Sequence, residues 1–126
     1  MIPEELRYTD EHEWVATKTD DLVRVGITEY AQNQLGDVVY VKLPDVGDRV
    51  EVGAAIGEVE STKSVSDLYA PLSGEVVAVN EAVTEQADLL NSDPYGEGWL
   101  FEIRVDDPDA LDGLLDADAY QAVTTG

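Results

Sequence analysis

Short apolar runs separated by polar turns fill most of the chain, and this pattern predicts β-strands. Near the N-terminus, two such runs lie at residues 13–17 and 22–27. Their large apolar side chains are Trp14, Val15, Leu22, Val23 and Val25. The sequence KTDD between them consists of polar residues typical of turns. We therefore expect these two segments to pair as a β-hairpin.

The spacing of apolar residues becomes helical in the sequence ITEYAQNQLG, residues 27–36. The apolar positions are Ile27, Tyr30, Ala31 and Leu35. These intervals place them on one face of a helix. Thr28 can cap the start, and Gly36 can adopt the left-handed conformation that often follows a last turn. The sequence therefore predicts a short internal helix.

The remaining apolar runs are also short, which again predicts strands. They lie at residues 38–43, 49–52, 54–60, 65–70, 75–80 and 99–105. All five prolines lie between the periodic segments, as expected because proline cannot donate to a central ladder. The C-terminal sequence DPDALDGLLDADAYQAV fits two short helical turns, with Asp107 or Asp116 as a cap. The pattern as a whole predicts a mainly β fold with a few short helices.

An internal repeat divides the chain. The sequence GDVVYV at residues 36–41 recurs as GEVVAV at residues 74–79. Each copy is followed by a polar turn and a second apolar segment, VEVGAAI in the first half and VTEQADLL in the second. The repeat predicts a sheet built from two similar halves, with the sequence VESTKSV as a hairpin turn at their junction. Gly74 is expected to supply a tight turn after Pro71.

Composition adds a strong constraint, because 28 acidic residues stand against 7 basic ones, for a formal net charge of −21. Such a charge repels itself at low ionic strength and is screened in concentrated salt. We interpret it as a salt-adapted surface and expect a halophilic prokaryotic source. The alternative is an acidic surface for a basic partner, although the acids are spread along the chain. The charge argues against nucleic acid or an anionic membrane as a partner.

The chain has no cysteine and one histidine, His12. It therefore lacks the residues for a disulfide, a thiolate nucleophile or a multi-histidine metal site, and we expect no metal. We expect His12 to be packed or hydrogen-bonded at the edge of the first hairpin. The N-terminus MIPEELRYTDEHEW lacks the basic and apolar regions of a signal peptide, and no apolar run is long enough to span a bilayer. We expect a soluble, cytoplasmic protein.

Lys63 stands out in the sequence GEVESTKSVSDLYAP because only three of the seven basic residues are lysines. It falls in the predicted hairpin turn, among the small residues Ser61, Thr62, Ser64 and Ser66. The ordinary interpretation is a solvated surface charge. A catalytic lysine needs burial or cationic neighbours to lower its pKa, and a turn beside Glu60 offers neither. An exposed amine on a flexible stem instead suits modification by an enzyme, as in a carrier protein.

Several separated motifs together resemble the H protein of the glycine cleavage system, a family of lipoyl carriers. They are, in order, YTDEHEWV, VGITEYAQNQLGDVVYVKLPDVGD, ESTKSVSDLYAPLSGEV and DPYGEGWL. The resemblance runs from about Leu6 to Val123. It implies one lipoyl-carrier domain over residues 1–126, with its core at about 6–123, and the barrel-sandwich hybrid fold of lipoyl and biotinyl carriers. Thr62 departs from the aliphatic residue expected before the lysine.

The resemblance also implies a non-catalytic, lipoylated carrier. (R)-lipoate would be joined through an amide to Lys63, and its dithiolane would supply redox chemistry that a chain without cysteine lacks. The expected partners are a pyridoxal-phosphate glycine decarboxylase, an aminomethyltransferase that uses tetrahydrofolate, dihydrolipoyl dehydrogenase and a lipoate-attaching enzyme. The arm would carry an aminomethyl group from the decarboxylase to the aminomethyltransferase.

Four further residues are candidates for contacts with the arm or with an enzyme. Glu13 and Asp67 are candidates to bind the protonated amine of the loaded arm, because charge-assisted hydrogen bonds are strong when partly desolvated. The alternative for both is a solvated carboxylate. Glu60 and Ser61 are candidates for recognition by the lipoate-attaching enzyme, and the alternative is that they only form the turn.

Other functions remain open on the sequence. The chain could be a lipoyl carrier or donor for another lipoate-dependent complex, although a minimal lipoyl domain would not need the HEW and DPYGEGWL segments. A biotin carrier typically has methionines around its lysine, and the one methionine here is Met1. An unmodified acidic binding module is an alternative of another class. An enzyme is disfavoured because no nucleophile and base pair emerges.

Overall fold

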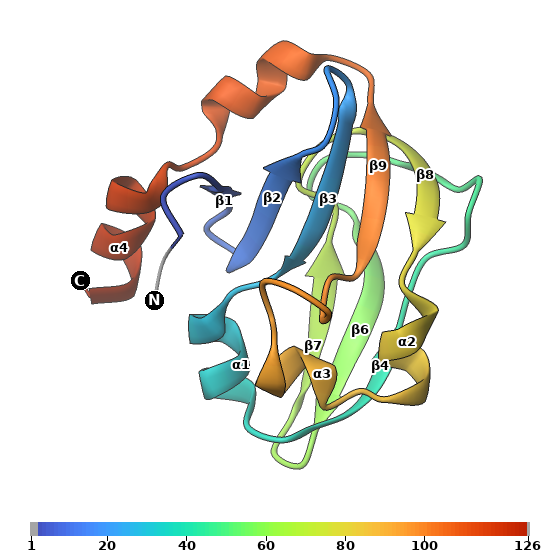
Figure 1. The fold of residues 1–126 in the computed structure, drawn as a ribbon, viewed down its shortest axis with the longest axis vertical. Coiled ribbons are helices and arrows are strands. Elements are labelled where there is room, and N and C mark those ends of the chain that lie inside the picture. The colour runs from blue at the N-terminus through green and yellow to red at the C-terminus, as the bar shows by residue number, and fades with distance from the viewer. Residues whose placement is uncertain (1–2, 126) are drawn as a thin grey trace.

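The structure, a computed structural model, describes residues 3–125 as two antiparallel β-sheets with short helices around them (Figure 1). The larger sheet has the strand order β1-β2-β3-β9-β8-β5, and the smaller has the order β4-β6-β7. The strands of the larger sheet are β1 (Arg7–Tyr8), β2 (Glu13–Thr17), β3 (Leu22–Ile27), β9 (Phe101–Val105), β8 (Gly74–Val79) and β5 (Arg49–Val50). Those of the smaller sheet are β4 (Val38–Lys42), β6 (Ala55–Ser61) and β7 (Val65–Tyr69). The predicted mainly β class is confirmed.

The first predicted hairpin is confirmed with the predicted bounds. Strands β2 and β3 pair antiparallel, with Val15 opposite Val25 and Thr17 opposite Val23. Val15, Val23 and Val25 are buried, because they lie on the face that packs against the rest of the molecule. The polar turn between the strands lies at the surface, as its sequence predicts.

The capping predictions are also confirmed. Helix α1 (Glu29–Leu35) begins after Thr28, whose Oγ1 accepts a hydrogen bond of 3.2 Å from the amide of Ala31. Gly36 follows the last turn with φ = 79°, in the range that favours glycine. At the C-terminal end, Asp107 caps the 3₁₀-helix η1 (Pro108–Gly113), and Asp116 lies at the start of α4 (Ala117–Thr125).

Residues 81–92 contain two short helices that the sequence pattern did not predict. Helix α2 (Glu81–Glu85) and helix α3 (Leu89–Ser92) replace the second apolar segment of the repeat. The reason lies in Asn80, whose side chain accepts a hydrogen bond from the amide of Ala82 and so caps α2. Asn80 also donates to the carbonyls of Glu97 and Trp99, which fixes the following loop against the helix start.

The repeat does not form one sheet. Its first copy is strand β4 of the smaller sheet, and its second copy is β8 of the larger sheet, where it pairs with β5 and β9. Gly74 also has a different role from the predicted tight turn after Pro71. It lies within β8, where a Cβ atom would collide with the carbonyl oxygen of Arg104 on β9. Close approach of two backbones therefore requires this glycine.

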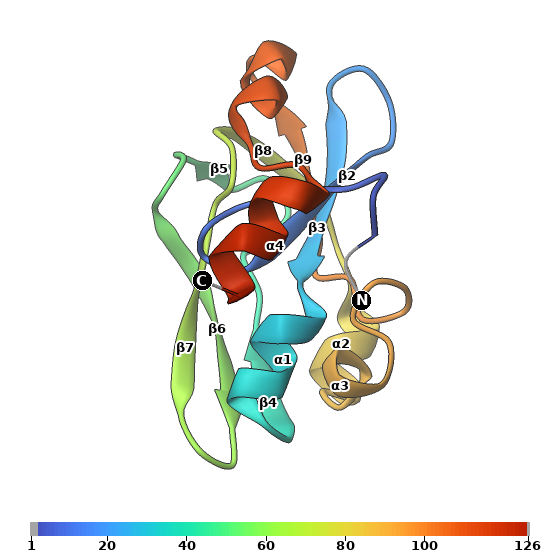
Figure 2. The same cartoon turned by 90° about the vertical axis from the view of Figure 1, so that its left-hand side faces the viewer.

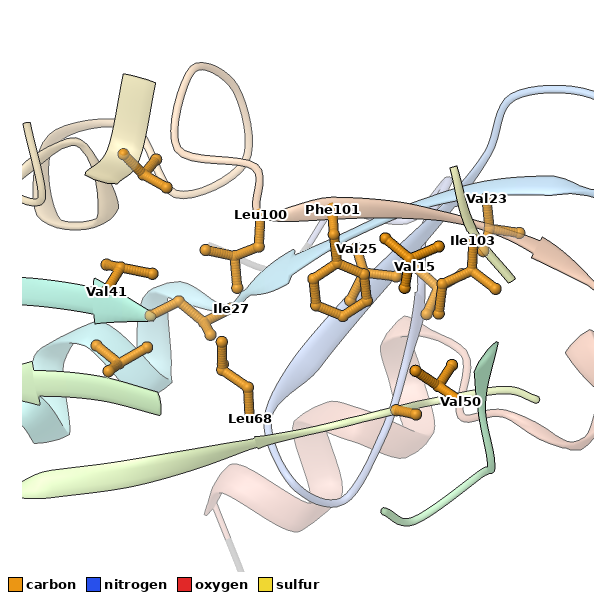
Figure 3. Packing of buried hydrophobic residues seen from close by; sticks show 14 of the residues in the cluster. Val15, Val23, Val25, Ile27, Val41, Val50, Leu68, Leu100, Phe101 and Ile103 are labelled. Atoms are coloured by element: carbon orange, nitrogen blue, oxygen red, sulfur yellow. The ribbon is translucent and has the colours of Figure 1, made fainter. Parts of the chain in front are cut away.

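The main core lies between the two sheets (Figure 3). Val15, Val25, Phe101 and Ile103 come from the larger sheet, and Val41, Val59 and Leu68 come from the smaller one. A fully buried side chain of this kind contributes about 1.5–3 kcal/mol to stability. A second cluster contains Tyr8, Trp14 and Tyr120, and the rings of Tyr8 and Tyr120 stack with centroids 4.6 Å apart. This cluster fixes the C-terminal helix to the N-terminal strands.

The helices leave one end of the smaller sheet uncovered. Figures 1 and 2 show the β6–β7 hairpin extending beyond α1 at the lower end of the molecule, away from α4. Within residues 3–125, no helix is long and apolar enough to cross a membrane. The hairpin end is where the sequence places Lys63.

Candidate functional site

The turn that carries Lys63 is built by Ser61. The amide of Ser61 donates to the carbonyl of Ser64 over 2.8 Å, which closes the hairpin. The Ser61 Oγ then accepts hydrogen bonds from the amides of Lys63 and Ser64, at 3.2 and 3.1 Å. Lys63 is exposed. The predicted hairpin turn is therefore confirmed, and Ser61 has the turn-forming role that was its alternative interpretation.

The turn is also held from the side, by the loop that precedes β4. The amide of Thr62 donates to the carbonyl of Asp37 over 3.0 Å. Asn91 of α3 fixes that loop, because its Oδ1 accepts from the amide of Val38 and its Nδ2 donates to the carbonyl of Gly36, both at 2.8 Å. Asn91 was not predicted as part of the site. Its sequence context, an amide residue in a short polar segment, gave no signal of a contact across the fold.

The stem of Lys63 lies against Gly36. A Cβ atom at position 36 would lie 3.2 Å from the Cδ of Lys63, closer than most real contacts of this kind. A side chain there would also be strained, because φ is 79°. Gly36 therefore leaves room for the aliphatic part of the lysine. The turn can present the amine because both its backbone and the stem are supported.

Glu13 is buried, in contrast to the alternative of a solvated carboxylate. Its side chain lies at the free edge of β7, where Oε2 accepts a hydrogen bond of 2.8 Å from the amide of Tyr69. Oε1 is buried without a hydrogen-bond partner among the described residues, and the residue is only 3% exposed. Burial raises the pKa of Glu13 to about 8, and the nearby Glu11 adds to this effect.

Asp67 is exposed, and its side chain lines the same cavity as Glu13. This cavity of about 390 Å³ runs along β7 from Glu13 to Ser64, the residue after Lys63, and it is also lined by His12. The carboxylate of Asp67 is the main cause that raises the pKa of Tyr69, two residues further along the strand. The structure therefore brings both predicted carboxylates to one cavity that begins beside the turn.

Glu60 is partly exposed. The side-chain hydrogen bonds to the turn amides of Lys63 and Ser64 come from Ser61. It lies opposite Tyr40 of β4 and Val65 of β7, on the face of the smaller sheet that is turned away from the core. This position leaves Glu60 accessible to a partner. Its role in enzyme recognition stays a prediction.

His12 is hydrogen-bonded, as predicted. Its Nδ1 lies 2.9 Å from the hydroxyl of Tyr120, and its ring centroid lies 4.7 Å from that of Tyr30. Burial is the main cause that lowers the pKa of His12. Among the residues that the structure describes, no group of three or more His, Asp and Glu side chains is placed to hold a metal ion.

Comparison with known proteins decides the family. The sequence model of the Glycine cleavage H-protein family matches residues 6–125. The chain belongs to the glycine cleavage H-protein family. The H protein of the glycine cleavage system from Mycobacterium sp. (strain KMS) is 62% identical over 127 residues, which cover 98% of this chain and 97% of that protein. The corresponding protein of Nocardia farcinica is 60% identical, with 100% and 98% covered.

The fold agrees with that of an H protein of known structure. The crystal structure of the H protein from Mycobacterium marinum superposes with a TM-score of 0.88 and 44% identity, covering 99% of this chain and all of that one. The expected lipoyl-carrier fold is thus confirmed, and as an H protein the chain is a carrier component of the glycine cleavage system. These relatives are from Mycobacterium and Nocardia and do not support the expected halophilic source.

Proposed function

We propose that this H protein carries (R)-lipoate in amide linkage on Lys63. The observation that carries the proposal is the exposed position of Lys63 on a turn whose backbone is fixed by Ser61 and by the loop before β4. The residues around the amine are small, so an enzyme can reach it. When bound, lipoate supplies a two-electron disulfide that the cysteine-free chain lacks.

The turn itself would orient the arm. Amide formation on Nζ removes the positive charge of Lys63, so the stem keeps only its packing against Gly36 as a fixed contact. The arm would then pivot about a supported stem and reach the cavity beside β7. The arm would carry the aminomethyl group from glycine decarboxylase to aminomethyltransferase, and dihydrolipoyl dehydrogenase would then reoxidise its dithiol.

Glu13 and Asp67 would bind the protonated amine of the loaded arm. The support is geometric, because Oε1 of Glu13 is buried without a partner and both carboxylates line the cavity next to Ser64. A cation that enters this cavity would satisfy Oε1 and favour its ionised form. Such a contact would shield the arm from water. Ser64 and Ser66 line the same cavity and could add hydroxyl contacts.

This second proposal is tested by the decay of the loaded protein. We expect loaded Glu13→Gln and Asp67→Ala proteins to lose formaldehyde and ammonia faster than the wild type. Asp20→Ala is the control, because Asp20 is an exposed acid in the turn between β2 and β3. Decay rates equal to the wild type in both cavity variants would contradict a role in holding the arm.

The carrier role as a whole is tested by glycine cleavage with purified decarboxylase, aminomethyltransferase and dihydrolipoyl dehydrogenase. The wild-type chain, lipoylated beforehand by a lipoate-attaching enzyme, should support turnover, and the chain alone should have no activity. Lys63→Arg should abolish turnover, whereas Lys18→Arg, on the first polar turn, should leave it intact. Turnover with Lys63→Arg would contradict the proposal. The cytoplasmic location and the absence of nucleic-acid and membrane partners stay predictions.

A further inference from the structure

The outer face of the smaller sheet carries exposed apolar side chains beside the hairpin turn. Within the described residues, the exposed large apolar residues are Val39, Tyr40, Val46, Val52, Val65 and Val123. Three of these six, Val39, Tyr40 and Val65, lie at this end of the sheet and are 58%, 48% and 58% exposed. Together with Glu60 they form what we call the tip patch.

The strand register brings the tip patch together. Tyr40 lies opposite Glu60, and Glu60 lies opposite Val65, so their side chains form a row across all three strands. A β-bulge before Tyr40 inserts Val39, so that two residues of β4 face one residue of β6. Tyr40 faces outward because it alternates with the buried Val41, and the bulge allows Val39 to be exposed as well while Val38 is buried.

The tip patch departs from the usual pattern of a sheet with one exposed face. Outward positions of such a sheet are normally polar. The next row along the strands follows that rule, with Glu58 opposite both Lys42 and Asp67. Asp67 belongs to the edge strand β7, and its side chain also lines the cavity that holds Glu13. The row nearest Lys63 instead has apolar side chains on both sides of one acid. Exposed apolar residues grouped in this way mark an interaction surface.

We propose that the tip patch is the docking surface for the lipoate-attaching enzyme. The inference rests on the proposed lipoylation of Lys63. That enzyme must bring its reaction centre to Nζ, which is roughly 6 Å from the backbone of the turn, the length of an extended lysine side chain. Its surface must therefore cover the strands on either side of the turn. Enzymes that act on the far end of the attached arm have no such requirement.

The charges on this face define the chemistry of the partner. Glu60 lies within the tip patch, and Glu58 and Asp67 lie in the adjoining row, against one lysine, Lys42. A partner that covers this face needs an apolar surface for the valines and tyrosine, with Arg or Lys residues placed against the carboxylates. Glu60 lies three residues before Lys63 and Val65 two residues after it, so the amine and the patch lie at the same end of the hairpin.

The test compares two kinds of valine variant. The double variant Val39→Ser, Val65→Ser removes the apolar part of the tip patch, and Val46→Ser is the matched control, because Val46 is 59% exposed but lies in the turn after β4. A purified ATP-dependent lipoate-attaching enzyme, supplied with lipoate, modifies each unlipoylated protein, and intact mass gives the initial rates. We expect kcat/KM to fall about tenfold in the double variant, from lost burial of two valine side chains, and to stay at the wild-type value in the control.

A second measurement distinguishes a surface used by the lipoate-attaching enzyme alone from one that the other enzymes also use. Samples of each variant are lipoylated to completion, and dihydrolipoyl dehydrogenase then reduces the arm at a rate that we expect to match the wild type. Thermal unfolding confirms that the variants fold. The single variant Val39→Ser is measured alongside, because Val65 also lines the cavity that holds Glu13 and Val39 does not, and it replaces the double variant if that protein does not fold.

Two results would overturn the inference. One is an attachment kcat/KM within about twofold of the wild type. The other is a reduction rate that falls as much as attachment does, which would indicate a surface shared by all partners. Failure of the proposed function is a separate result, because the wild type would then gain no lipoyl group on Lys63 at all.

Discussion

Glu13 is the residue whose surroundings change its chemistry most. Burial raises its pKa from 4.5 to about 8, so the folded state favours the protonated form near neutral pH. The unfolded chain loses this proton near pH 4.5, and the folded chain does so only near pH 8. The free energy of unfolding contributed by Glu13 is therefore fully present below pH 4.5 and is lost as the pH rises to about 8.

Glu13→Gln should remove this pH dependence. Urea unfolding of the wild type and the variant from pH 4 to pH 9 gives two stability curves, and their difference cancels the other carboxylates. We expect the wild type to lose stability relative to the variant between about pH 4.5 and pH 8, by an amount on the order of a few kcal/mol. Parallel curves across this range would contradict the raised pKa.

The sequence predicted the position of Lys63 but not the surroundings of Glu13. Lys63 could be placed because small polar residues between two apolar runs define a turn by local preference. Glu13 starts a strand in which Glu13, Trp14 and Val15 are all buried, so the alternation expected of a surface strand is absent. Its burial depends on the edge of β7, which lies more than fifty residues away in the chain.

At the scale of elements, the short helix α3 supports the functional turn. Asn91→Ala would remove the hydrogen bond that Oδ1 accepts from the amide of Val38 and those that Nδ2 donates to Gly36 and Gln32. We expect a loss of roughly 1–3 kcal/mol in the free energy of unfolding, since partly buried partners are left unsatisfied. We also expect slower enzymatic lipoylation, because the loop that contacts Thr62 would loosen.

The control for this prediction is Asn33→Ala, which removes an exposed amide of α1 that accepts a hydrogen bond from Gln32. Its stability and lipoylation rate should stay close to those of the wild type. If Asn91→Ala lost stability but kept the wild-type lipoylation rate, α3 would support the fold without positioning the turn.

Elements with local signals were predicted, and those set by distant contacts were not. The β2–β3 hairpin and the cap of α1 follow from residues close together in sequence, and the structure confirms both. Strand β1 was not predicted, because its two residues depend on pairing with β2 and on a bridge from Tyr8 to Leu115. Helix α2 was missed because Asn80, which the pattern placed at the end of a strand, caps it, and α3 begins without a side-chain cap that could have marked it.

At the scale of the whole molecule, the net charge of −21 should make stability depend on salt. From roughly 0.01 M to 1 M salt the Debye length falls from about 30 Å to about 3 Å, which screens repulsion between exposed carboxylates. We expect the melting temperature at pH 7 to rise by several degrees over this range of NaCl, as measured by circular dichroism. The same series near pH 4.1, the isoelectric point of the sequence, should give a smaller rise. Equal salt effects at both pH values would contradict a role for net charge.

Attachment of the lipoyl group to Lys63 can be detected by intact mass spectrometry of the protein from its own source. We predict a mass increase of one lipoyl group, located by peptide mapping to the segment with Lys63 and absent from Lys63→Arg. An unmodified mass, or an adduct that persists in Lys63→Arg, would show that Lys63 is not the lipoylated residue.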